Sequence, residues 1–149
     1  MIVRDIVKMK GGAIFSIAPG DKVSEAVGMM VRHDVGSLVV MEDASMVGML
    51  TFREVLRALE ANRARYGELA VRDIMIREPA CGSVEDSLES LREMMNKDHI
   101  RYLPVRDGEK LVGVISFHDV ANAVIKELAF HNRLLKSYIK NWPEEESAK

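Results

Sequence analysis

A ten-residue phrase that occurs twice constrains the fold of this chain more than any other feature. Residues 46–55 (MVGMLTFREV) are matched by residues 111–120 (LVGVISFHDV), 65 positions further along. The same offset relates residues 23–58 to residues 88–123 without a gap. Self-similarity at a fixed offset indicates one supersecondary unit that is used twice.

Each copy of this unit shows the pattern strand, helix, strand, strand, helix. In the first copy, residues 14–17 are a strand candidate and helical spacing begins at Val23. Residues 38–41 and 46–50 are apolar runs typical of strands that are covered on both faces. Thr51 is expected to begin the second helix.

A three-stranded sheet with two helices is too small to bury its apolar face alone, so we expect the two units to pack sheet to sheet. The predicted fold class is therefore α+β, with two βαββα repeats related by a pseudo-two-fold axis and a long C-terminal helix. Residues 1–68 would form the first repeat with a lead-in and a connector, and residues 69–126 the second repeat. Residues 127–149 would be a helix extension and an acidic tail.

The helical spacing continues beyond the second repeat as far as Trp142, where Pro143 is expected to end the helix. Its apolar positions, among them Leu128, Leu135 and Tyr138, form a stripe wider than a lone exposed helix needs. We expect this stripe to pack on the body or on a second subunit, and we predict a homodimer.

Charge and composition exclude several classes of protein. With 21 basic and 23 acidic residues the formal net charge is −2, which argues against a general nucleic-acid binder. No apolar run approaches the roughly 18 residues of a membrane span, and no signal peptide is visible. The lone Cys81 fits a reducing compartment, so we expect a cytoplasmic protein. No metal-ligand spacing and no catalytic trio is visible, so neither a metal site nor an enzyme is predicted.

Three features, each present twice, resemble a tandem pair of CBS domains, the cystathionine β-synthase type regulatory repeat. They are the strands at 35–40 (VGSLVV) and 100–105 (IRYLPV), the Val-Gly that opens the next strand, and the Thr/Ser-x-x-carboxylate at its end. The resemblance covers roughly residues 6 to 126. The phrase at 33–40 and the long last helix are similar to small stand-alone bacterial and organellar CBS pairs.

The resemblance implies an adenosine-containing ligand such as AMP, ADP, ATP, NAD or S-adenosylmethionine, with no obligatory cofactor and no catalysis. It also implies two clefts between the repeats. In each cleft, the carboxylate of one repeat would bind the ribose hydroxyls while basic groups of the other approach the phosphates.

The paired motifs Thr51/Glu54 and Ser116/Asp119 suit such a ligand chemically. A ribose presents two vicinal hydroxyl donors, and a carboxylate on the first turn of a helix can accept both. Free backbone N–H groups at a helix start also favour anionic oxygen. Adenine needs an apolar slot, for which the candidate walls are Phe15, Met49, Ala80 and Val114.

The same two motifs are also capping-box patterns, in which the acid bonds back to the start of its own helix. A cap contributes about 0.5–2 kcal/mol to helix stability and needs no ligand. The spacing alone is compatible with either role.

The two clefts are not expected to be equal. Asp119 matches the residue that the family prefers, whereas Glu54 is one methylene longer. Arg101 falls where the family often places a phosphate-facing basic residue, but its counterpart in the first repeat is Gly36. The predicted pairing is crosswise: Glu54 with Arg101 and His118 in one cleft, and Asp119 and Ser116 with Arg53 in the other.

We therefore predict a regulatory, signal-transducing module that binds an adenosyl ligand and modulates an unknown partner protein. The alternative is a structural dimerisation or interaction module with empty clefts, which the departures at Glu54 and Gly36 favour.

Overall fold

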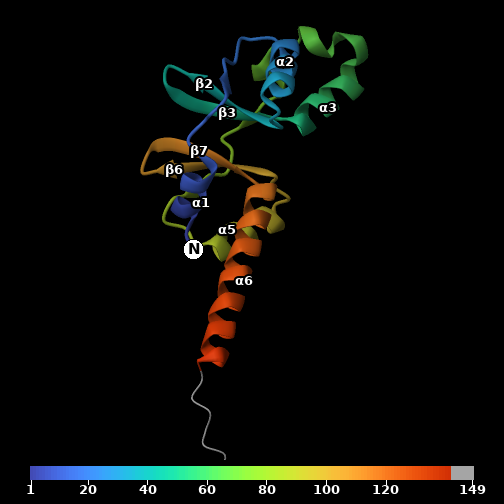
Figure 1. Cartoon of the computed structure of the whole chain (residues 1–149). Helices are drawn as coiled ribbons and strands as arrows, with labels where there is room; N and C mark the ends of the chain where they lie inside the picture. The colour runs from blue at the N-terminus through green and yellow to red at the C-terminus, as the bar shows by residue number, and fades with distance from the viewer. Residues whose placement is uncertain (142–149) are drawn as a thin grey trace, which may run out of the picture.

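Two sheets face each other at the centre of the molecule, and the helices cover their outer sides (Figure 1). The structure is a computed structural model that describes residues 1–141. The predicted fold class, a mixed α and β fold of two repeats with a long C-terminal helix, is confirmed. The expected stop at Pro143 and the acidic residues 144–146 lie outside the described residues.

The first sheet and its helices come from the first half of the chain. The elements are β1 (Ser16–Ile17), α2 (Val23–His33), β2 (Ser37–Glu42), β3 (Ser45–Thr51) and α3 (Phe52–Asn62). Strand β1 runs parallel to β2, and β2 and β3 form an antiparallel hairpin.

The second sheet repeats this arrangement with β5 (Gly82–Ser83), α5 (Leu88–Lys97), β6 (Tyr102–Asp107), β7 (Lys110–Ser116) and α6 (Phe117–Lys140). Its order is β5-β6-β7, again parallel and then antiparallel. The hairpin register follows the sequence offset, because both hairpins shift register at the equivalent residues of β2 and β6.

Four further described elements lie outside this repeated arrangement. They are α1 (Val3–Lys10) at the start, then a 3-10 helix (Arg63–Glu68), α4 (Val71–Ile74) and β4 (Ile76–Arg77) in the middle of the chain. The helices α1 and α4 begin with the same four residues, Val-Arg-Asp-Ile. In both, the aspartate accepts a hydrogen bond from the backbone N–H that precedes the helix, at 3.1 Å.

Each of these lead-in helices packs into the repeat that it does not precede. Val3 and Ile6 of α1 are buried in the core of the second sheet, whereas Val71 of α4 is buried in the core of the first. The backbone anchors are equivalent: Val3 N–H donates to Asp86 O at 2.9 Å, and Val71 N–H donates to Asp21 O at 2.8 Å. We call β1–β3 with α2, α3 and α4 the first lobe, and β5–β7 with α5, α6 and α1 the second lobe.

The segments that follow the two lead-in helices differ. After α4, strand β4 pairs with β3, so the first sheet has four strands where the sequence predicted three. Two residues, Ile76 and Arg77, are too few to show the alternation that marks a strand. After α1 the chain passes through Gly11, at φ +84°, and Gly12, and within residues 1–141 no equivalent strand pairs with β7.

Along each strand, side chains that face the core of the lobe alternate with side chains that face the other sheet. On β2, for example, Leu38 and Val40 belong to the core of the first lobe, and Val39 lies on the opposite face. Val39 and its cross-strand partner Met49 are both 1% exposed on the first sheet. Their repeat counterparts are Pro104, which is buried, and Val114, which is only half-buried. Val39 and Val114, from opposite sheets, both line the space between the lobes that is described below.

Helix α6 projects beyond the second lobe (Figure 1). Every described residue after Glu127 is exposed, including Leu128, Leu135 and Ile139. Among the described residues, no helix is both long and apolar enough to cross a membrane.

The exchange of lead-in helices predicts which lobe a mutation will weaken. Val3→Ala removes fully buried methyl groups from the second lobe and should cost roughly 1–3 kcal/mol of unfolding free energy. Hydrogen exchange should show reduced protection in β6 and β7 before β2 and β3. Val71→Ala should produce the converse pattern, and Lys8→Ala, at an exposed position of α1, should change neither. Loss of protection in β2 and β3 with Val3→Ala would contradict the exchange.

Candidate functional site

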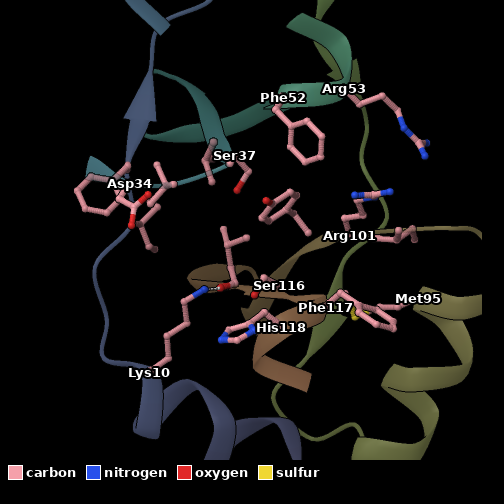
Figure 2. Close-up of a pocket in the computed structure, with 18 of the residues that line it drawn as sticks. Lys10, Asp34, Ser37, Phe52, Arg53, Met95, Arg101, Ser116, Phe117 and His118 are labelled. Atoms are coloured by element: carbon pink, nitrogen blue, oxygen red, sulfur yellow. Dashed lines mark hydrogen bonds between the residues drawn. The ribbon is translucent and has the colours of Figure 1, made fainter. Parts of the chain in front are cut away.

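A cavity of about 760 Å³ lies between the two lobes (Figure 2). Its volume is within the range of small-molecule sites. Both lobes contribute equivalent segments, residues 34–37 before and at the start of β2 and residues 99–102 before and at the start of β6. The remaining lining comes from residues 10, 13–15, 39, 52–53, 95–96, 114 and 116–118.

Two arginines from opposite lobes lie on one side of this cavity. Arg53 comes from the first turn of α3 and Arg101 from the residue before β6, and their guanidinium groups lie near each other in Figure 2. Arg101 is held by a cation–π contact, with its Cζ atom 5.5 Å from the centroid of the Phe52 ring. No ion pair within residues 1–141 engages either arginine. Both charges are therefore available to an anion.

Gly36, before β2, and Arg101, before β6, are equivalent positions, and packing explains why only one of them carries an arginine. At Gly36, the counterpart of Arg101, an added Cβ would overlap the hydroxyl oxygen of Tyr102. The Tyr102 ring also meets Phe52 edge-on, with centroids 6.3 Å apart. The space beside Gly36 is thus filled by an aromatic side chain of the other lobe.

On the opposite side of the cavity, Lys10 extends from the end of α1 towards Ser116 and His118 (Figure 2). Its ammonium group donates to Asp119 Oδ2 at 2.7 Å and to the backbone oxygen of Val114 at 2.6 Å. Asp119 Oδ2 also accepts from the Ser116 N–H at 2.8 Å, and Ser116 Oγ accepts from the Asp119 N–H at 3.1 Å. Asp119 therefore caps its own helix and pairs with Lys10 at the same time.

The protonation of Asp119 is set by opposing effects. Burial favours the neutral carboxyl and by itself raises its pKa. The hydrogen bond from Lys10 and the one from the Ser116 backbone outweigh burial, so the pKa of Asp119 lies below its ordinary value. The carboxylate is consequently charged at neutral pH.

The first repeat's motif is in a different environment. Glu54 Oε2 accepts from the Thr51 N–H at 2.9 Å and also from the Thr51 hydroxyl. The two residues form a capping box, in which the Thr51 side chain in turn accepts from the backbone N–H of Glu54. Glu54 is only 9% exposed, and neither residue lines the cavity. Met49 is buried beside β4, and Ala80 is exposed elsewhere.

The structure thus brings some of the residues that the sequence singled out to one cavity and leaves others away from it. Those that line it are Phe15, Arg53, Arg101, Val114, Ser116 and His118. Asp119 is connected to it through Lys10. Those that do not line it are Met49, Thr51, Glu54 and Ala80.

Several lining residues were not identified from the sequence. Asp34 and His99 are equivalent, 65 positions apart, and both take the left-handed backbone conformation that ends a helix, at φ +51° and +52°. The repeat offset is a signal that could have paired them. Lys10 had no such signal, because it lies before the region in which the offset holds. The cavity therefore presents Lys10, Arg53 and Arg101 against one carboxylate, Asp34.

The helix starts offer fewer free donors than the sequence suggested. Phe52 N–H donates to Gly36 O at 2.9 Å, and Phe117 N–H donates to Arg101 O at 2.8 Å. An anion in this cavity would therefore meet charged side chains more than free backbone N–H groups. Within residues 1–141, no group of three His, Cys, Asp or Glu residues could hold a metal ion.

The family models and the curated relatives both match this chain to the same family. The family model for the CBS domain matches twice, at residues 3–61 and 71–126. The CBS domain-containing protein YhcV of Bacillus subtilis is 32% identical over 108 residues, which are 72% of this chain and 76% of that protein.

Solved structures agree with the sequence comparison. The CBS-domain containing protein ATU1752 from Agrobacterium tumefaciens superimposes with a TM-score of 0.78 at 27% identity, covering 82% of this chain and 97% of that one. CBSX2 in complex with AMP superimposes with a TM-score of 0.69 at 22% identity, covering 84% of this chain and 96% of that one.

The charge state of Asp119 predicts an acid-dependent stability. Because the pKa of Asp119 is lowered in the folded protein, its contribution is present above the unfolded value of about 3.9 and is lost as pH falls through the folded value. Asp119→Asn should therefore flatten the fall in unfolding free energy below about pH 4. Asp98→Asn, at an exposed position, should keep the wild-type slope. Equal slopes in denaturant titrations of wild type and Asp119→Asn would contradict the assignment.

Proposed function

The chain belongs to the CBS domain family, as a tandem pair of these domains, and on that premise we propose that it is a regulatory module that binds an adenosine-containing anion between its lobes. The observation that carries the proposal is the pair of arginines, Arg53 and Arg101, which face one cavity from opposite lobes without a carboxylate partner in residues 1–141. A cationic cavity in a chain of net charge −2 selects anions locally.

The cavity has a place for each part of a nucleotide. Arg53 and Arg101 would hold phosphate oxygens through charge-assisted hydrogen bonds. Ser116 and the Asp119 carboxylate, on the opposite side, would accept the ribose hydroxyls. Phe15 and Val114 would supply apolar contact to the base.

Charge also discriminates among the candidate ligands. AMP, ADP, ATP and NAD carry phosphates that suit two arginines, whereas the sulfonium of S-adenosylmethionine would be repelled by them. CBSX2, which has the same fold, was crystallised with AMP, and this supports the ligand class. We therefore place AMP and its phosphate-bearing relatives ahead of S-adenosylmethionine.

We infer regulation without catalysis. Thr51 does not line the cavity, and within residues 1–141 the Ser116 hydroxyl, which does, donates no hydrogen bond to a histidine or carboxylate that could act as its general base. A ligand that contacts both lobes would change their relative positions and so alter what a partner protein binds. The regulated target would be another polypeptide.

The ligand proposal predicts selective losses of affinity. By calorimetry, Arg53→Ala and Arg101→Ala should each weaken AMP binding by roughly ten- to a hundredfold, as expected when a hydrogen bond to a charged group is removed. Adenosine, which lacks the phosphate, should lose much less. Arg57→Ala is a matched control, because Arg57 is exposed on α3 and does not line the cavity.

The alternative function is an interaction module that binds no ligand. The buried capping box at Thr51 and Glu54 favours it for the first repeat's motif. If AMP, ATP, NAD and S-adenosylmethionine produce neither heat nor a thermal shift at millimolar concentration, this alternative replaces the ligand proposal. In that case Asp119→Ala combined with Glu54→Ala should lower stability but leave partner binding intact.

We also propose that a second copy of the chain covers the exposed part of α6. Val124, Leu128, His131, Leu135 and Tyr138 recur at alternating spacings of four and three, the pattern of a helix–helix seam. The leucines are 61% and 58% exposed. Ile125, Leu134 and Ile139 broaden the same stripe. An identical helix satisfies such a self-complementary surface in a two-fold dimer.

Light scattering at micromolar concentration should therefore report a dimer for the wild type. Leu135→Lys places a charge in the seam and should shift the protein to monomer, because an unpaired charge is costly to bury. Ala129→Lys adds the same charge on the exposed opposite side of α6 and should leave the dimer unchanged. A wild-type monomer, or an equal response to both substitutions, would rule out this interface.

A further inference from the structure

Lys10 is the cavity residue with the least expected position. It is the last residue of α1, so the exchanged lead-in helix delivers it to the start of α6, 109 positions away in the sequence. Its side chain is 38% exposed and its ammonium bridges two acceptors, Asp119 Oδ2 and Val114 O. Val114 and Asp119 flank Ser116, which lines the cavity. Lys10 therefore occupies the space directly in front of the carboxylate.

The arrangement is particular to the second lobe. The phrase Val-Arg-Asp-Ile at the start of α1 recurs at the start of α4, 68 positions later, and this offset pairs Lys10 with Glu78. An acid at that position cannot bind the carboxylate of Glu54, whose described partners are the N–H and hydroxyl of Thr51. The lysine is thus a difference between the halves and not a consequence of the repeat.

Lys10 and a ribose would compete for the same atoms. Asp119 is hydrogen-bonded to its own helix start through Oδ2, the oxygen that also receives Lys10. A ribose diol approaching from the cavity needs acceptor positions on the carboxylate, and a carboxylate offers only about four. Both described bonds to the carboxylate fall on Oδ2, so a diol that bonds both carboxylate oxygens at once has to take the place of the Lys10 ammonium on Oδ2.

The chain after Lys10 allows such a displacement. Gly11 takes φ +84°, and an added Cβ on Gly11 or Gly12 would meet no atom within 4 Å. The two residues that follow α1 are therefore not closely packed. Upstream, Val3 and Ile6 of the same helix are buried in the core of the second lobe. Movement of the Lys10 side chain therefore alters a contact made by α1, the helix that completes the core of the second lobe.

We propose that the Lys10 ammonium competes with the ribose hydroxyls of a ligand for the Asp119 carboxylate. This competition would set how strongly the cavity prefers ligands with a ribose diol. Displacement of Lys10 by a ligand would also change a contact of α1. The inference rests on the proposed function, because it concerns the same cavity. The proposed function is extended in two ways: Lys10 becomes a residue that determines ligand specificity, and ligand binding changes a contact of α1. Lys10 acts on the ribose end of the site, and Arg53 and Arg101 act on the phosphate end.

The test compares AMP with 2′,3′-dideoxyadenosine monophosphate, which has the same base and phosphate but no diol. The ratio of their dissociation constants isolates the diol, since any effect of Lys10 on the phosphate cancels. In Lys10→Met the preference for AMP should rise roughly two- to fivefold, the equivalent of releasing a partly exposed ion pair. Lys8→Met, on the exposed part of the same helix, should keep the wild-type ratio.

A ligand-free measurement makes the inference independent of affinity. The pKa of the Asp119 carboxyl, followed by NMR, should be higher in Lys10→Met than in wild type and unchanged in Lys8→Met. An unchanged Asp119 pKa in Lys10→Met would show that the contact does not form in solution and would overturn the inference.

The outcomes separate this inference from the proposed function. If AMP binds the wild type but its preference over the dideoxy analogue is unchanged or smaller in Lys10→Met, the competitor role is wrong and the nucleotide site stands. If no variant, including Lys10→Met, binds AMP at millimolar concentration, the proposed function is wrong and the inference falls with it. Binding by Lys10→Met alone would support both.

Discussion

The packing of Val3 and Val71 into the core of the opposite repeat is the interaction on which the rest of the structure depends. Each lobe has a sheet with helices on one side, and a lead-in helix from the other repeat completes its core. This exchange ties the lobes together more firmly than contact between two finished domains would, because separating them exposes core side chains. The exchange of α1 and α4 therefore fixes the relative position of the two lobes that line the cavity.

The exchange also creates the asymmetry of the two repeats. Chain that leaves α4 adds β4 to the first sheet, beside Met49, whereas chain that leaves α1 passes through Gly11 and Gly12. Glu54 is buried and, among the described residues, is bonded only to Thr51, whereas Asp119 caps its helix and also pairs with Lys10 at the edge of the cavity. Two nearly identical motifs acquire different roles because their neighbours in space differ.

Much of the fold follows from the sequence. The offset of 65 identified both hairpins, and their register reproduces it residue by residue. Local signals also located the starts of α3 and α6, because Thr51 and Ser116 act as caps through contacts within four residues. β4 was not predicted, since two residues carry no periodic pattern and its pairing with β3 is a long-range contact.

For the candidate site, the sequence by itself determined which chemical groups are available: a repeated hydroxyl-x-x-acid motif and basic residues beside it. It could not decide whether each acid caps a helix or faces a ligand, because both roles use the same local spacing. Only the tertiary structure decided that Arg53 and Arg101 converge on one cavity, that Tyr102 fills the space at Gly36, and that Lys10 reaches Asp119. Those relations depend on which distant segments of the chain are brought together, and no local pattern in a sequence records that.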